Sequence, residues 1–174
     1  MNKININFQE YLELERLSDN SFLPVKNFMK KKEAISVINK MRYKNKTFPL
    51  PILLSIELKQ YNELLMNNST VNLIYKNILV GKIINPEIFK IDINKMCKKI
   101  FGTTNIKHPG VNFYKNQSGL FIGGRTILKR KIQHEFKKFE INPKQVKRLK
   151  IKKKLNTLVG FQTRNIPHKA HEFL

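Results

Sequence analysis

A change of pattern near residue 155 is the feature that most limits how this chain can fold. Before it, short apolar runs alternate with turn residues, which is typical of a compact, strand-rich module. After it come the apolar run Thr157–Phe161, a polar loop and Pro167, a residue type favoured at the first position of a helix. Such a run is typical of a buried parallel strand. We therefore expect two parts, residues 1–154 and residues 155–174.

The first part is expected to alternate helices with short strands. Apolar residues recur at helical spacing over 31–41. Lys76 and Asn77 separate two apolar runs, and Asn tolerates a positive φ, so we expect a hairpin there. Asp92 suits a helix N-cap and Gly102 suits a helix end. The expected helices are 31–41, 93–100 and 143–153, and the expected strands are 47–58, 71–75, 78–84, 88–91, 111–114 and 120–122.

The second part is too short to build a sheet of its own. A parallel strand reaches its neighbour through a crossover of about a dozen residues or more. From Thr157 onward the sequence has room for one strand and about two turns of helix. Either this strand joins the first part, or the chain is the front part of a longer protein. We favour the second interpretation.

The large positive charge of the chain is only weak evidence for a polyanion partner. Lys and Arg number 34 against 12 Asp and Glu, for a net charge of +22. However, 28 of the 34 are Lys, and Lys, Asn and Ile come from A/T-rich codons, so genome composition alone can supply the charge. A phosphate-binding surface would be expected to use more Arg, whose fork binds phosphate bidentately. We therefore do not expect specific nucleic-acid binding.

Other classes of protein are excluded by what the sequence lacks. The single cysteine, Cys97, cannot form an intrachain disulfide framework or a Cys-based zinc site. No apolar stretch approaches the roughly 20 residues that span a membrane, and the N-terminus has no signal-peptide core. We expect a cytoplasmic protein without a membrane partner.

The polar string near the C-terminus can bind anions. A helix N-terminus carries free N–H groups and partial positive charge, and Gln162–Asn165 places an Arg fork and two amides just before it. His168 and His171 are three residues apart and share one helix face. This arrangement predicts two anions meeting above a strand–loop–helix turn, as nucleotidyl transfer requires.

Taken singly, the same residues have ordinary structural explanations. The two histidines alone are a weak signal, and Asn165 could simply cap the helix. A zinc site would lack Cys and have only Glu172 as a nearby carboxylate, so we expect no metal site. Elsewhere, His108 is expected to be a turn residue, and His134, in a basic stretch, is expected to be solvated.

The string Gln162–Asn165 followed by His168–Glu172 resembles the signature of sulfate adenylyltransferase (ATP sulfurylase). Further segments resemble that family in the same order along the chain: Phe22–Val25 with Phe28–Met29, Phe48–Ile52, Phe101–Thr104, His108–Val111 and the glycine turn Gly123–Gly124. An ordered set over about 150 residues is far more specific than two histidines alone. Asn27 stands where the family has Gly, and Ile166–Pro167 departs from its usual loop.

The resemblance implies an α+β fold. A β-rich PUA-like N-terminal domain would be followed by the start of a truncated α/β Rossmann-like nucleotidyltransferase domain. The implied reaction joins sulfate to MgATP and gives adenylyl sulfate and pyrophosphate, with no covalently bound cofactor. The remainder of the catalytic domain would come in cis or in trans, and a homo-oligomer is left open. The 174-residue chain alone is expected to be inactive.

The resemblance also implies roles for residues of the string. Gln162 and Arg164 would bind sulfate, and Thr163, Arg164 and Asn165 would be catalytic. Asn165, His168 and His171 would contact the ATP phosphates. The alternative is a stand-alone PUA-like module that binds RNA or a protein without catalysis.

Overall fold

The computed structural model describes residues 2–64, 69–163, 166 and 168–169. The chain forms two compact units, Met1–Glu140 (the N-terminal unit) and Ile141–Leu174 (the C-terminal unit). No helix in the described part of the chain is long and apolar enough to cross a membrane.

A five-stranded sheet organises the N-terminal unit. Its strand order is β1-β5-β6-β7-β4, and β1 runs parallel to β5 while the other pairs are antiparallel. A separate pair, β2 with β3, is antiparallel. The strands are β1 (Lys3–Asn5), β2 (Arg42–Tyr43), β3 (Lys46–Thr47), β4 (Leu54–Ser55), β5 (Thr70–Tyr75), β6 (Ile78–Lys90) and β7 (Leu120–Leu128).

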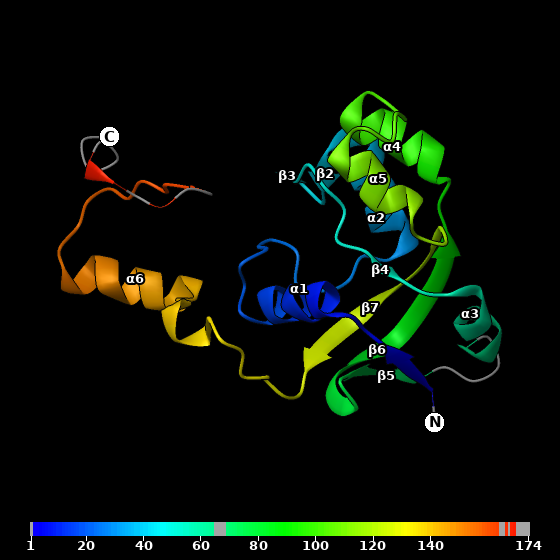
Figure 1. The fold of residues 1–174 in the computed structure, drawn as a ribbon, viewed down its shortest axis with the longest axis horizontal. Helices are drawn as coiled ribbons and strands as arrows, with labels where there is room; N and C mark the ends of the chain where they lie inside the picture. Colours follow the sequence, from blue (N-terminus) through cyan, green and yellow to red (C-terminus); the bar gives the residue numbers. More distant parts are fainter. Residues whose placement is uncertain (1, 65–68, 164–165, 167, 170–174) are drawn as a thin grey trace. The chain divides into compact units, whose positions relative to one another are not determined.

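Helices cover the sheet and one of its ends. Figure 1 shows α2, α4 and α5 gathered beside the end of β6 that leads into α4, and α1 lying against the sheet near β7. The helices are α1 (Phe8–Ser18), α2 (Lys31–Lys40), α3 (Leu58–Leu64), α4 (Ile93–Phe101), α5 (Pro109–Lys115) and α6 (Pro143–Lys152), with a 3₁₀ turn η1 at Lys137–Phe139.

The core lies between α1, the sheet and the segment before α2. Tyr11, Leu14 and Leu17 of α1 are buried, as are Phe28 and Phe121. Burying one large apolar side chain stabilises a fold by about 1.5–3 kcal/mol. The sequence analysis did not anticipate α1. The sequence does carry a capping-box pattern there, Asn7 followed three residues later by Glu10. In the structure, the side chain of Asn7 accepts from the Glu10 amide, and the side chain of Glu10 accepts from the Asn7 amide.

The predicted hairpin and three predicted helices are confirmed. Lys76 and Asn77 both have positive φ, 47° and 62°, as a tight hairpin turn requires. Asp92 caps α4 by accepting from the Lys95 amide at 3.1 Å, and Gly102 ends that helix at φ 71°. The strands expected at 78–84 and 88–91 are one strand, β6, interrupted by a register shift between Ile84 and Glu87.

Two of the strands predicted in the N-terminal unit were wrong, one entirely and the other over most of its length. Of the strand expected over 47–58, only Thr47 and Leu54–Ser55 lie in strands, because Pro49 and Pro51 cannot donate to a ladder. The strand expected over 111–114 is part of the helix α5. Pro109 begins α5, and the Val111 amide donates to Nδ1 of His108 at 3.4 Å. His108 is therefore a helix cap.

The glycine pair Gly123–Gly124 lies inside β7, although a turn was expected there. The chain segment before α2 packs onto this part of the strand, since the Gly124 amide donates to the Phe28 carbonyl at 3.0 Å. The side-chain oxygen of Asn27 accepts from the Thr126 amide at 2.8 Å. A Cβ on Gly123 would overlap the Met29 carbonyl, so only glycine fits there.

Replacing Gly123 by Ala should therefore destabilise the N-terminal unit. The added methyl must push backbone atoms of Met29 away, and overpacking of this kind costs about 1–3 kcal/mol. Urea denaturation followed by circular dichroism measures the loss. Gly160→Ala is the matched control, because a Cβ at Gly160 meets nothing within 4 Å. Equal stabilities of the two variants would contradict the packing described.

Candidate functional site

The C-terminal unit begins with the well-capped helix α6. Asn142 Oδ1 accepts from the Gln145 amide at 3.0 Å, and Gln145 Oε1 accepts from the Asn142 amide at 2.7 Å. Pro143 occupies the first turn, where its missing N–H has no bond to lose. This confirms the predicted lysine-rich helix, which ends at Lys152.

The strand predicted at Thr157–Phe161 is not formed. These residues lie in neither helix nor strand, and all are exposed, with Val159 at 93%. The physical reason is that a β-strand needs a partner for its amide and carbonyl groups, and none of the strand pairs includes residues 157–161. An apolar run is therefore left facing solvent.

The structure describes part of the predicted anion site. Gln162, Thr163 and His168 are described, and all three are exposed. Arg164, Asn165 and His171 lie outside the described residues, as does Pro167 at the expected helix start. The sulfate and phosphate roles of these residues consequently stay predictions.

A charged cluster that the sequence analysis missed lies in the N-terminal unit. The side chain of Glu15 on α1 is only 6% exposed. Lys137 Nζ donates to both of its carboxylate oxygens at 3.0 Å and to Glu140 Oε2 at 3.0 Å. Burial would lower the pKa of Lys137, but its bonds to Glu15 and Glu140 outweigh burial and raise it. Lys137 therefore stays charged at neutral pH.

The same cluster holds the segment after β7 against α1. The Ile132 amide donates to the Tyr11 hydroxyl at 2.7 Å, and burial raises the pKa of Tyr11 to about 12. His134 Nε2 lies 3.5 Å from Glu140 Oε1, and its ring meets the Phe8 ring edge-on at 5.8 Å. The expectation that His134 is solvated was wrong, since its side chain is 15% exposed.

This cluster could be mistaken for a metal centre. Ligand atoms of Glu15, His134 and Glu140 all lie within 4.8 Å of one another. The ammonium group of Lys137 already lies between the two carboxylates, where it occupies the position of a cation and offsets one of their two negative charges. We therefore interpret the cluster as a clamp that fixes the chain, with a structural role.

Two family models match the chain in succession. The model of the PUA-like domain matches residues 1–130, and that of ATP-sulfurylase matches residues 137–174. Because the first match covers most of the chain, the protein belongs to the PUA-like domain family. The expected fold class, α+β with a PUA-like N-terminal domain, is confirmed.

The chain is also similar to curated relatives that are named sulfate adenylyltransferase. The chain is 31% identical to the sulfate adenylyltransferase of Persephonella marina, over 100% of this chain and 46% of the relative. It is 28% identical to that of Thermococcus onnurineus over 98% of this chain and 44% of the relative. These matches confirm the resemblance to sulfate adenylyltransferases. The chain spans less than half the length of these relatives.

A solved structure shares the fold. The protein titled "Hexameric APS kinase from Thiobacillus denitrificans" superposes with a TM-score of 0.62 at 14% sequence identity. The match covers 88% of this chain and 27% of that one. At this identity the likeness supports the arrangement of helices and strands alone.

Replacing Lys137 by Met should destabilise the N-terminal unit by about 3 kcal/mol, because Glu15 would be left buried without its cation. Chemical denaturation of the 174-residue chain measures the change. Lys131→Met, an exposed position in the same segment, is the matched control and should shift stability by at most about 0.5 kcal/mol. A loss of similar size in both variants would show that the clamp contributes nothing specific.

Proposed function

We propose that the chain is the N-terminal part of a sulfate adenylyltransferase, which forms adenylyl sulfate and pyrophosphate from ATP and sulfate. The observation that carries the proposal is the order of the matches. A PUA-like domain over residues 1–130 is followed by an ATP-sulfurylase match over 137–174, and that second match contains the whole anion-binding string. Relatives named sulfate adenylyltransferase align with nearly the entire chain.

The proposed chemistry follows from the side chains of the string. A sulfate oxygen attacks the α-phosphorus of ATP and pyrophosphate leaves, so negative charge develops on the phosphoryl oxygens. Gln162 and Arg164 would hold sulfate, and Arg164 can do so with two parallel hydrogen bonds. Thr163 and Asn165 are uncharged partners for the reacting oxygens. Mg²⁺ would arrive with ATP as part of the substrate.

The two histidines would act on the phosphates of ATP. At helical spacing of three residues, His168 and His171 can approach the same anion. Asn165 would contribute an amide donor to the same phosphates. Hydrogen bonds to a charged partner are worth about 1.5–3 kcal/mol each, and they accelerate the reaction only where they strengthen in the transition state.

The rest of the catalytic domain, in cis or in trans, is part of the proposal. Leu158 and Val159 expose apolar side chains to solvent in the C-terminal unit. Apolar residues in such a run favour burial against a partner. The remaining length of the curated relatives would supply neighbouring strands, which would turn this run into a paired strand and bring the anion-binding string into position.

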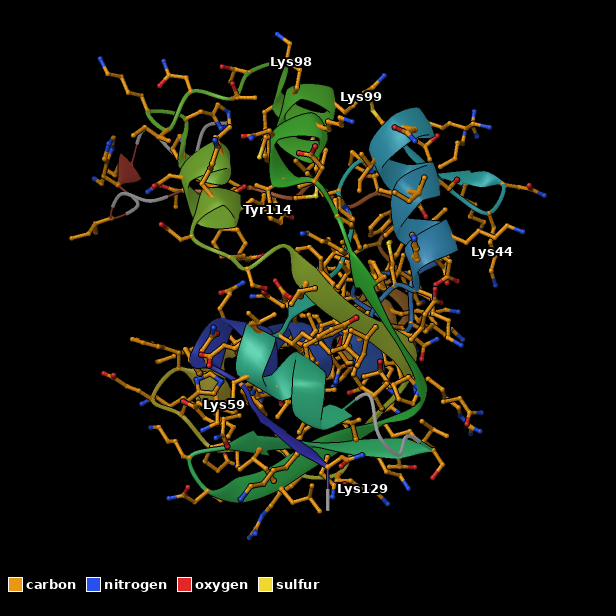
Figure 2. All side chains as sticks on the ribbon, turned by 90° about the vertical axis from the view of Figure 1, so that its right-hand side faces the viewer. Lys44, Lys59, Lys98, Lys99, Tyr114 and Lys129 are labelled. Carbon is orange, nitrogen blue, oxygen red and sulfur yellow. The ribbon has the colours of Figure 1, made fainter. Side chains whose placement is uncertain are left out.

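The distribution of lysines supports an enzyme better than a nucleic-acid-binding module. Figure 2 shows Lys44, Lys59 and Lys129 on different sides of the N-terminal unit, apart from Lys98 and Lys99 on α4. A surface that reads a nucleic-acid backbone gathers its cations on one face or stripe. The dispersed lysines fit the interpretation that composition supplies them. Oligomerisation stays a prediction.

A chimeric enzyme tests the proposal. Residues 1–174 would be joined to the part of the Persephonella marina relative that this chain does not match. We expect sulfate-dependent release of pyrophosphate from ATP by the chimera and none by the 174-residue chain alone. Arg164→Ala should lower kcat/KM by about 100-fold, as loss of a charge-stabilising donor does.

Arg148→Ala is the matched control for the chimera, because Arg148 is exposed on α6, outside the string. It should leave kcat/KM within about twofold of the unmodified chimera. A folded chimera without sulfate-dependent activity, or equal losses in the two Arg variants, would overturn the proposal.

A further inference from the structure

An acidic cavity interrupts the basic surface of the N-terminal unit. Its volume is about 580 Å³, within the usual range of small-molecule sites. It opens between the first half of α1, the segment Pro51–Glu57, α3 and α5. Glu10, Glu13 and Glu57 are among its lining residues.

The charge of this cavity departs from that of the rest of the chain. Basic residues outnumber acidic ones by 34 to 12 in the sequence, yet no Lys or Arg is among the described residues that line it. In the described part of the chain, Glu10, Glu13 and Glu57 form no salt bridge. A biased genome composition explains why lysines occur at many positions. It does not explain why the described lining of this cavity contains glutamates and no lysine.

One side-chain acceptor of the lining, Gln117 Oε1, has no hydrogen-bond partner among the described residues. This oxygen is buried. A buried acceptor left without a donor costs about 1–3 kcal/mol. A donor in the cavity would relieve that cost once the Gln117 side chain turns its oxygen into the cavity. Carboxylates accept only, which means that the complementary ligand is rich in N–H donors and positively charged.

Apolar and aromatic groups complete the lining. Phe113 and Tyr114 of α5 lie edge to face, with ring centroids 5.1 Å apart, and Pro51 and Leu53 face the same space. Aromatic faces attract organic cations, and apolar side chains pack against methylene groups. A hydrated metal ion would use neither, because its ligands are oxygen atoms and water.

We propose that this cavity binds an aliphatic amine carrying two or more protonated nitrogens. The carboxylates of Glu10, Glu13 and Glu57 would receive the ammonium groups, Gln117 would accept a hydrogen bond, and Phe113 and Leu53 would contact the methylene chain. The site lies in the PUA-like unit and is independent of the proposed nucleotidyl transfer.

Protonation of Glu13 should couple this binding to pH. The pKa of Glu13 is raised to about 7, mainly by burial and also by the nearby charge of Glu10, against the lowering effects of Gln9 and Arg16. On α5, burial is the main cause that raises the pKa of Tyr114 to about 12, so that group stays neutral. A bound ammonium favours the ionised carboxylate. The amine should therefore bind more tightly at about pH 8 than at about pH 6, where Glu13 is largely protonated.

Titration calorimetry of the 174-residue chain with spermidine tests the site. We expect saturable binding at one site, weakened about tenfold by Glu13→Gln and by Glu10→Gln, each of which removes one charge. Glu135→Gln, at an exposed position away from the cavity, is the matched control and should change the affinity less than twofold. Non-specific attraction cannot mimic this result, because a net charge of +22 repels a polycation.

Several outcomes would overturn the proposal. These are no saturable binding of spermidine at about pH 8, an equal effect of Glu135→Gln, or unchanged affinity in both cavity variants once circular dichroism shows that they are folded. Titration with Mg²⁺ alone and with a short lysine peptide separates the sources of positive charge. If Mg²⁺ binds more tightly than spermidine and the Glu13→Gln variant loses that binding, the cavity is a metal site. If the lysine peptide does so, the cavity binds protein lysines. Either result would overturn the assignment to a free amine.

Discussion

The antiparallel pairing of β6 with β7 is the constraint on which the N-terminal unit depends. The two strands pair from Gly81 with Leu128 to Lys90 with Leu120, and the sheet is completed by β5 along β6 and by β4 along β7. The ladder is interrupted between Ile84 and Glu87, where Asn85 has a φ of 49°. An irregularity of this kind bends a strand. One continuous pair of strands can therefore contact α1 along β7 and α2 at the end of β6.

Glycines make that pairing compatible with close packing from both sides. Gly124 has a φ of 155°, and a Cβ there would come within 2.8 Å of Ile83 Cγ2. Gly123 leaves room for the Met29 backbone. The two positions therefore need glycine for different reasons, one for backbone conformation together with space and the other for space alone.

Local signals in the sequence predicted the elements that depend on local chemistry. The Lys76–Asn77 turn, the Asp92 cap and the Asn142–Pro143 helix start each involve a few neighbouring residues, and all three are confirmed. The apolar run at 47–58 is only partly in strands because Pro49 and Pro51 interrupt it. The run at 157–161 failed as a strand because pairing depends on a distant partner, which the sequence pattern does not specify. The Glu15–Lys137 clamp was missed for the same reason, since its residues are 122 positions apart. For the anion-binding string, the residue types and spacing were readable, but the arrangement of Arg164, Asn165 and His171 was not.

The clamp between Glu15 and Lys137 has a mechanical consequence. Lys137 lies after β7 and three residues before the end of the N-terminal unit at Glu140. A force applied to the chain beyond Glu140 would act first on this ion pair and on the hydrogen bond between the Ile132 amide and the Tyr11 hydroxyl. It would reach β7 only after these contacts had broken. Two anchors on α1 would thus share the load, and the last strand of the sheet would be shielded from motions of whatever follows it.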